Sequence, residues 1–270
     1  MSVWYCIPSK RSPTEANICL DKWRAQGYKI ALWRDSGDEP IACDLMISGE
    51  YPGYAQAVNA LCAEVLKSDP DCDWCVTGGD DIEPDPNQSA EEIARQCSEH
   101  FGKPLGLPPE PVRENRPDFL HAELQATSAY LRINYSLPTF GVMQPTGDRF
   151  AQGSIDRIAG SPWMGREWCE RANGGQGPFW PEFTHMFGDE ALQRTAQKLG
   201  VFWQRPDLIH LHHHFMRKST DINSPAVPTV IPPHLVEWNS QRHWNEMQAI
   251  FRRLEAHGFA PCMPLAEVAA

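Results

Sequence analysis

Apolar and polar positions follow two periods along the first third of the chain. Short apolar runs with the length and composition of buried strands occur at 3–8, 28–35 and 73–79. Segments with apolar residues at helical spacing lie between and after them, at 12–27, 53–70 and 87–102. The first of these opens with Ser12, Pro13 and Glu15, which together form a helix start signal. Strands that alternate with helices predict a parallel sheet covered by helices on both faces.

The remainder of the chain is less regular. A stretch rich in proline and glycine at 103–115 predicts a loop. Further on, the pattern predicts a strand at 139–147, a short helix at 165–173 and a clearer helix at 188–200. A strand and turn are expected at 201–215, followed by a long helix at 234–258 whose mixture of aromatic and charged residues suggests one face packed on the body.

Composition narrows the class of protein. No apolar run approaches the roughly 20 residues that cross a bilayer, and the first residues lack the order of a signal peptide, so we expect a soluble cytoplasmic protein without a membrane partner. A net charge of −11 argues against a broad nucleic-acid-binding face but leaves room for a local basic groove.

Cysteine usage points to a reducing compartment. The nine cysteines are an odd number and are scattered through apolar stretches, which is typical of reduced thiols. Cys72 and Cys75 form an isolated C-x-x-C pair without a second pair at metal-ligand spacing. We therefore interpret them as strand residues.

The clearest candidate for chemistry is the run CVTGGDDIEPDPN, which starts at Cys75. A buried strand leads directly into Asp80 and Asp81, whose charges repel each other unless a cation or a shared proton offsets them. Mg²⁺ and Mn²⁺ prefer such oxygen ligands. Because Asp, Gly and Pro are also turn residues, an ordinary turn explains the pattern equally well.

Two more segments carry candidate groups. In the run HLHHH, strand alternation would put His210, His212 and His214 on one face, and a cluster of this density suggests metal ligands. Asp189 and Glu190 begin the helix at 188–200, where negative charge is favoured by the helix dipole alone.

Taken in order, these segments resemble nucleotide-sugar glycosyltransferases of the GT-A fold, in particular the inverting family 2 group. VWYCIPSKR resembles the first strand and loop that hold the nucleotide, and GEYPGYAQAVNAL resembles the helix below it, with matches at Gly53 and Asn59. VTGGDDIEPDP stands where the family carries its metal-binding DxD motif. The first aspartate of that motif falls on Gly79, which leaves Asp81 as the metal ligand and Asp80 toward the ribose or sugar.

Two later motifs extend the resemblance. FGDEALQRTAQKLG is similar to the helix that carries the family's catalytic base, which falls on Asp189, although the glutamate expected before it is replaced by Gly188. RPDLIHLHHH is similar to the motif that ends in a histidine able to complete the metal shell, here His212. The region from HMFGDE to HLHHHF also resembles glycosyltransferase-like proteins of tailed bacteriophages, some of which attach sugars to 5-hydroxymethyl pyrimidines in DNA.

The resemblance implies a fold, a reaction and a division of the chain. We expect an α/β protein with a GT-A, Rossmann-like, mostly parallel mixed sheet flanked by helices. The catalytic domain would span 1–217, with a nucleotide-sugar half at about 1–102 and an acceptor half at about 116–217, and a C-terminal extension would follow at 218–270. The reaction would be inverting transfer of a sugar from a nucleotide diphosphate, with UDP as the first choice, aided by Mn²⁺ or Mg²⁺.

Residue roles follow from the same resemblance. Asp81 and His212 would bind the ion and Asp189 would be the base. The residues expected around the nucleotide sugar are Pro8, Ser9, Arg11, Asp35, Gly53, Asn59 and Asp80. The residues expected on the acceptor side are Trp163, Gly165 and Arg166.

The acceptor hydroxyl could belong to a DNA base, a glycan or a small molecule. Three alternatives remain open: a metal-dependent hydrolase that uses the histidines and aspartates, a non-catalytic relative that binds nucleotide sugars, and a nucleotidyltransferase on a similar fold.

Overall fold

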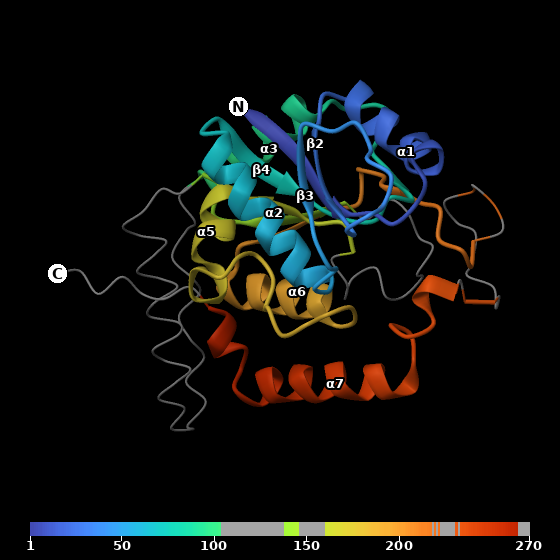
Figure 1. Cartoon of the computed structure of the whole chain (residues 1–270). Helices are drawn as coiled ribbons and strands as arrows, with labels where there is room; N and C mark the ends of the chain where they lie inside the picture. The colour runs from blue at the N-terminus through green and yellow to red at the C-terminus, as the bar shows by residue number, and fades with distance from the viewer. Residues whose placement is uncertain are drawn as a thin grey trace, which may run out of the picture.

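The protein is an α/β structure in which one large sheet is covered by helices on both faces (Figure 1). The computed structural model describes residues 1–103, 138–145, 160–217, 219, 221, 230–231 and 233–263. Most of the proline-rich segment at 103–115 and much of the expected acceptor half therefore lie outside the described residues. Among the described helices, none combines the length and the apolar character that crossing a bilayer requires.

The sheet has seven strands in the order β3-β2-β1-β4-β7-β6-β8. The strands on the amino-terminal side are β1 (Ser2–Pro8), β2 (Lys29–Arg34), β3 (Leu45–Ser48) and β4 (Cys72–Val76), all parallel. The others are β6 (Val142–Pro145), β7 (Trp163–Gly165) and β8 (Phe202–Arg205). Only β7 is antiparallel to its neighbours, so the expected mostly parallel mixed sheet is confirmed. A second sheet pairs β5 (Ile82–Glu83) with β9 (Leu211–His212).

Alternation along β1 divides the core into two layers. Val3, Tyr5 and Ile7 face one side, against helices α1 (Pro13–Ala25) and α3 (Ala90–Phe101). Trp4 and Cys6 face the other side. The helices of that second layer are α2 (Tyr54–Ser68), α5 (Arg166–Gly175), α6 (Gly188–Leu199) and α7 (Gln241–Ala256).

Local signals explain where the helices begin. Ser12 and Glu15 form the expected capping box at the start of α1, with Pro13 as its first residue. At α3, the Ser89 side chain accepts a hydrogen bond from the Glu92 backbone N–H. The last helix starts at Gln241 with Ser240 as its cap, later than the sequence pattern suggested, because a short 3-10 turn at Pro233–Leu235 and further turns come first.

The C-terminal helix α7 lies against the body of the protein (Figure 1). Its buried residues include His243, Met247 and Phe251. His243 Nε2 lies 3.0 Å from Thr184 Oγ1, and Phe251 contacts Phe187. The helix thus covers the segment that leads into α6.

Gly165 illustrates how tightly β7 is held. A Cβ at this position would lie 1.9 Å from the carbonyl oxygen of Thr139, although its φ of −71° suits any residue. We expect Gly165→Ala to lower the free energy of unfolding by about 3 kcal/mol or more, because backbone would have to move. Gly160→Ala is the matched control, since a Cβ there meets no described atom within 4 Å. Urea denaturation of both variants checks this, and equal stabilities would contradict it.

Candidate functional site

The candidate site lies where the chain order of the sheet reverses. From β1 the chain moves outward through β2 and β3, then returns to place β4 on the other side of β1. In open α/β sheets, ligands bind outside the carboxyl ends of the strands at such a switch point. Here Ser9 and Arg11 follow β1, and Asp80 and Asp81 follow β4.

Arg11 supplies the positive charge that the adjacent aspartates require. Its Nε lies 2.8 Å from Asp80 Oδ1 and its Nη2 lies 3.4 Å from Asp81 Oδ2. Ser9 donates a further hydrogen bond of 2.7 Å to Asp80 Oδ2. Both carboxylates are thus held by the loop after β1, so the repulsion between them is partly offset without any bound ion.

The short β5–β9 sheet brings the histidine run to the same place. Ile82 pairs with His212, and the backbone N–H of His213 bonds the carbonyl of Asp81 at 2.8 Å. As a result, His212 Nε2 lies 3.4 Å from Asp81 Oδ1. The His214 ring lies next to the His212 ring, with centroids 5.1 Å apart. The expected pairing of Asp81 with His212 is therefore present in the structure.

The electrostatics keep Asp81 ionised. Burial alone would raise its pKa, but the hydrogen bond from His212 and the nearby charges of His212 and Arg11 lower the pKa to about 2. Burial is the main reason why the pKa of His214 falls to about 4. At neutral pH the site therefore presents an ionised Asp81 carboxylate, the form that binds metal ions, and the His214 ring beside His212 is neutral.

The distances fit a divalent ion. Two ligand atoms about 2.1 Å from one ion lie about 3.0 Å apart when they occupy adjacent corners of an octahedron. The Asp81 and His212 ligand atoms are 3.4 Å apart, so a shift of a few tenths of an ångström would let both bind Mn²⁺ or Mg²⁺. A neutral imidazole in the shell favours Mn²⁺ over Mg²⁺.

A second group of ligand-type side chains lies beside the first. Cys19, Glu83 and His213 each offer one ligand atom, and these three atoms lie within 4.8 Å of one another. Glu83 Oε1 is 2.5 Å from His213 Nε2 and 2.6 Å from Lys22 Nζ, so its charge is already paired. Burial raises the pKa of the Cys19 thiol to about 12, and Glu83 adds to this rise, so the thiolate form is disfavoured. An ion in this group would therefore have to displace the thiol proton and the Lys22 ion pair.

Tyr54 links α2 to the loop that precedes Asp80. The Tyr54 hydroxyl lies 2.9 Å from Thr77 Oγ1 and donates to the carbonyl of Gly78 in that loop. Burial raises the pKa of Tyr54, and the Asp189 carboxylate raises it further. Asp189 is half-buried in the first turn of α6, and burial raises its own pKa.

Gly53 positions the segment that leads to Asp189. It caps α2 with a φ of +104°, and a Cβ there would lie 2.9 Å from Thr184. The neighbouring Tyr54 backbone N–H bonds the Thr184 carbonyl at 2.6 Å. The absence of a side chain thus lets the chain before α6 approach the start of α2.

The loop residues after β2 lie at the same edge of the sheet. Asp35 pairs with Lys10 at 2.8 Å, and Pro8 ends β1. Arg34, which the sequence analysis did not single out, is buried and donates to the carbonyls of Ser9 and Arg11. Arg34 therefore fixes the loop that carries Ser9 and Arg11.

The structure does not bring the three expected acceptor residues to the edge that carries Asp80 and Asp81. Trp163 is completely buried in the core, where it contacts Tyr28, so its ring cannot stack on an acceptor. Because β7 is antiparallel, the chain after Trp163 runs toward the amino ends of the parallel strands. Arg166 there donates to the carbonyls of Cys72, Asp69 and Pro70. Gly165 is required for the close approach to Thr139.

Asn59, which was expected near the nucleotide, makes its hydrogen bonds within the protein. Its Nδ2 donates to the Phe179 carbonyl at 2.8 Å, and its Oδ1 accepts from the Phe179 N–H at 3.0 Å. The amide is buried and fastens the loop at 176–180 to α2.

The remaining histidine of the run belongs to the core. His210 is buried, its Nδ1 lies 2.9 Å from Ser161 Oγ, and its ring contacts Trp23 edge-on. Burial lowers its pKa to about 3. Strand alternation therefore did not predict which histidines share a face, because β9 covers only Leu211–His212.

Arg11 and a divalent ion compete for the same carboxylates. We expect Arg11→Met to raise the affinity for Mn²⁺ alone by about tenfold, since the two aspartates lose their present counter-charge. Electron paramagnetic resonance of free Mn²⁺ measures the change, with Lys10→Met as the control that removes a nearby charge paired to Asp35 instead. Unchanged affinity in Arg11→Met would mean that the ion binds away from Asp80 and Asp81.

Gly53→Ala is expected to lower the free energy of unfolding by about 1–3 kcal/mol more than Gly27→Ala does. Both glycines have positive φ, +104° and +88°, but only at Gly53 would a Cβ meet Thr184. The difference between the unfolding free energies of the two variants, measured by chemical denaturation, therefore gives the cost of the contact between a Cβ and Thr184. Equal losses of stability in the two variants would show that a Cβ at position 53 does not clash with Thr184.

Comparison of the chain with protein-family models and with curated proteins returned no match in either case.

Proposed function

We propose that the protein is a metal-dependent inverting glycosyltransferase that uses a nucleotide diphosphate sugar, with UDP as the expected nucleotide. The observation that carries the proposal is the meeting of Asp81 and His212, from segments far apart in sequence, at the switch point of the sheet. The mostly parallel mixed sheet is compatible with the GT-A fold that the sequence resembles. The order of the DxD-like, aspartate-helix and histidine segments supports the same proposal.

The residues at the carboxyl edge have distinct parts in donor binding. Asp81 and His212 would hold Mn²⁺ or Mg²⁺, which when bound supplies positive charge for the donor's diphosphate and for the leaving nucleotide. Arg11 lies within reach of the same phosphates and adds a second positive charge once an ion takes over Asp80 and Asp81. Asp80, Ser9 and Asp35 offer hydrogen-bonding groups to the ribose or sugar.

Asp189 is proposed as the general base. It would accept the proton of the acceptor hydroxyl as the oxygen attacks the anomeric carbon and the bond to the nucleotide diphosphate breaks on the opposite face. A raised pKa makes a carboxylate a stronger base, and burial raises the pKa of Asp189. The acceptor class is proposed as a hydroxyl on a DNA base, a glycan or a small molecule.

The test is a screen of nucleotide sugars with and without Mn²⁺. We expect one sugar nucleotide to raise the thermal stability of the protein in a metal-dependent manner and to be slowly hydrolysed in the absence of acceptor. The matched controls are Asp81→Ala, which should lose both effects, and Glu83→Gln, which should keep them. If no nucleotide sugar stabilises the protein, or if stabilisation is unaffected by a chelator, the proposed function is wrong.

A metal-dependent hydrolase is the second candidate, and the group formed by Cys19, Glu83 and His213 favours it. Such an enzyme would bind a transition metal in this group without any nucleotide. Metal titration of Cys19→Ser in the absence of nucleotide separates the two candidates. Loss of metal binding in this variant favours the hydrolase, whereas unchanged binding excludes this group as its metal site.

A further inference from the structure

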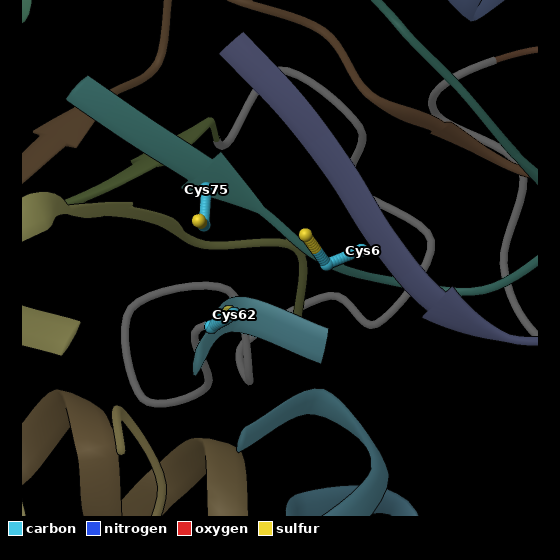
Figure 2. Close-up of side chains that lie close together, drawn as sticks. All are labelled: Cys6, Cys62 and Cys75. Carbon is cyan, nitrogen blue, oxygen red and sulfur yellow. The ribbon is translucent and has the colours of Figure 1, made fainter. Parts of the chain in front are cut away.

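Cysteine side chains from separate elements converge in the core on the α2 side of the sheet. Figure 2 shows Cys6 on β1 and Cys75 on the neighbouring strand β4, with Cys62 of α2 facing them. One sulfur atom from each lies within 4.8 Å of the others, and all three residues are buried. These three thiols come from parts of the chain that meet only in the folded protein.

Two more thiols border this group. The Cys72 sulfur lies 3.9 Å from that of Cys75. Cys169, on α5, is buried in the same core layer, and its thiol donates to the carbonyl of Met164 at 3.8 Å. Cys6, Cys62 and Cys75 therefore surround one point from β1, α2 and β4.

Ordinary core packing explains the positions of the other buried cysteines better than it explains this cluster. Cysteine is a common small core residue, and a single buried thiol needs no explanation. In the core layer on the opposite face, Cys97 is buried among apolar side chains. In the α2 layer, by contrast, sulfur atoms face one another, which is the donor set that soft metal ions select.

We propose that Cys6, Cys62 and Cys75 form a buried, sulfur-only site for a thiophilic ion, Zn²⁺ or Cu⁺. With a metal–sulfur distance of about 2.3 Å, tetrahedral thiolates lie about 3.8 Å apart. The present sulfur separations of up to 4.8 Å would contract by about 1 Å or less on binding. Binding converts thiols to thiolates and releases their protons to solvent.

The surroundings suit a structural ion rather than a catalytic one. The three cysteines are at most 1 % exposed, so neither solvent nor substrate reaches their sulfur atoms. The guanidinium of Arg166 donates to the Cys72 carbonyl at 2.7 Å, so a positive charge lies at one end of the thiol group. An ion here would join β1 to β4 directly behind the loops that carry Ser9 and Asp80.

Elemental analysis of the full chain tests the proposal. The protein is purified without a metal-affinity tag and dialysed against a chelator before the analysis. We expect about one zinc or copper per chain, and the element found distinguishes Zn²⁺ from Cu⁺. Cys6→Ser and Cys62→Ser should lower this content by roughly tenfold or more. Cys97→Ser and Asp81→Ala should retain it, which separates this site from the one at Asp81 and His212.

A second measurement keeps the test decisive if a cysteine variant does not fold. The reduced wild-type protein is titrated with Cd²⁺ under nitrogen, and the ultraviolet absorption of cadmium–thiolate bonds is recorded. We expect saturation at about one equivalent per chain. A protein that is purified without zinc or copper and shows no such absorption would overturn the proposal, leaving the thiols as core residues.

Discussion

Asp189→Asn is expected to lower the rate of sugar transfer by about 10²- to 10⁴-fold, the usual contribution of a general base. The asparagine keeps the size of the side chain and the oxygen that accepts the Glu190 backbone N–H at 2.8 Å. It cannot accept the proton of an attacking hydroxyl. Donor binding, measured by calorimetry with Mn²⁺ present, should stay within about twofold because Asp189 is not one of the proposed ion ligands.

The stability of the same variant provides its control. A carboxyl whose pKa is raised in the folded protein carries a charge that disfavours folding at neutral pH, so removing that charge should maintain or increase stability. In the wild type, the acid limb of the rate profile should lie above the pH at which ordinary aspartates titrate. Full activity of Asp189→Asn, or a loss that merely follows unfolding, would exclude Asp189 as the base.

Asp81→Ala is expected to weaken metal-dependent binding of UDP by about 100-fold or more, because it removes the carboxylate that faces His212. Calorimetric titration with UDP in the presence of Mn²⁺ measures the loss. Glu83→Gln is the matched control, since Glu83 lies on the same short sheet but in the neighbouring group. If Glu83→Gln abolished binding and Asp81→Ala did not, the ion would belong to that neighbouring group.

The same substitution should have a small, pH-dependent effect on stability. The Asp81 pKa of about 2 lies below the ordinary 3.8, so its ion pairs stabilise the fold fully above pH 3.8 and lose this effect as the pH falls through 2. At neutral pH we expect Asp81→Ala to cost about 1–2 kcal/mol. The difference should shrink as the pH is lowered, when chemical denaturation of both proteins is compared.

The amino-terminal half of the site was predictable because it follows from parallel strands. Once β1 and β4 are both assigned as parallel strands, the residues after them must meet at one edge, which brings Ser9 to Asp80. The partner of Asp81 was not predictable from local pattern, because β5 and β9 are short and far apart in sequence. His212 was identified as this partner from the order of the sequence motifs.

The failures have physical causes of their own. A three-residue strand such as β7 carries no signal for its direction, and that direction places Gly165 and Arg166 at the edge of the sheet away from Asp80 and Asp81. Arg11 was expected beside the nucleotide sugar, and its pairing with the two aspartates in the free protein was not foreseen. The convergence of cysteines depends on strand register, since Trp4 pairs with Cys75, and the continuous apolar runs of these strands do not reveal their register.

The central claim is that one divalent ion is shared by Asp81 and His212 when nucleotide binds. Electron spin-echo envelope modulation of Mn²⁺ bound with UDP tests it most directly, because this method detects a nitrogen atom coordinated to the ion. We expect nitrogen modulation in the wild type and its loss in His212→Ala, with Mn²⁺ still bound at high concentration. Modulation that persists in His212→Ala, or a wild-type spectrum without any nitrogen signal, would contradict the account.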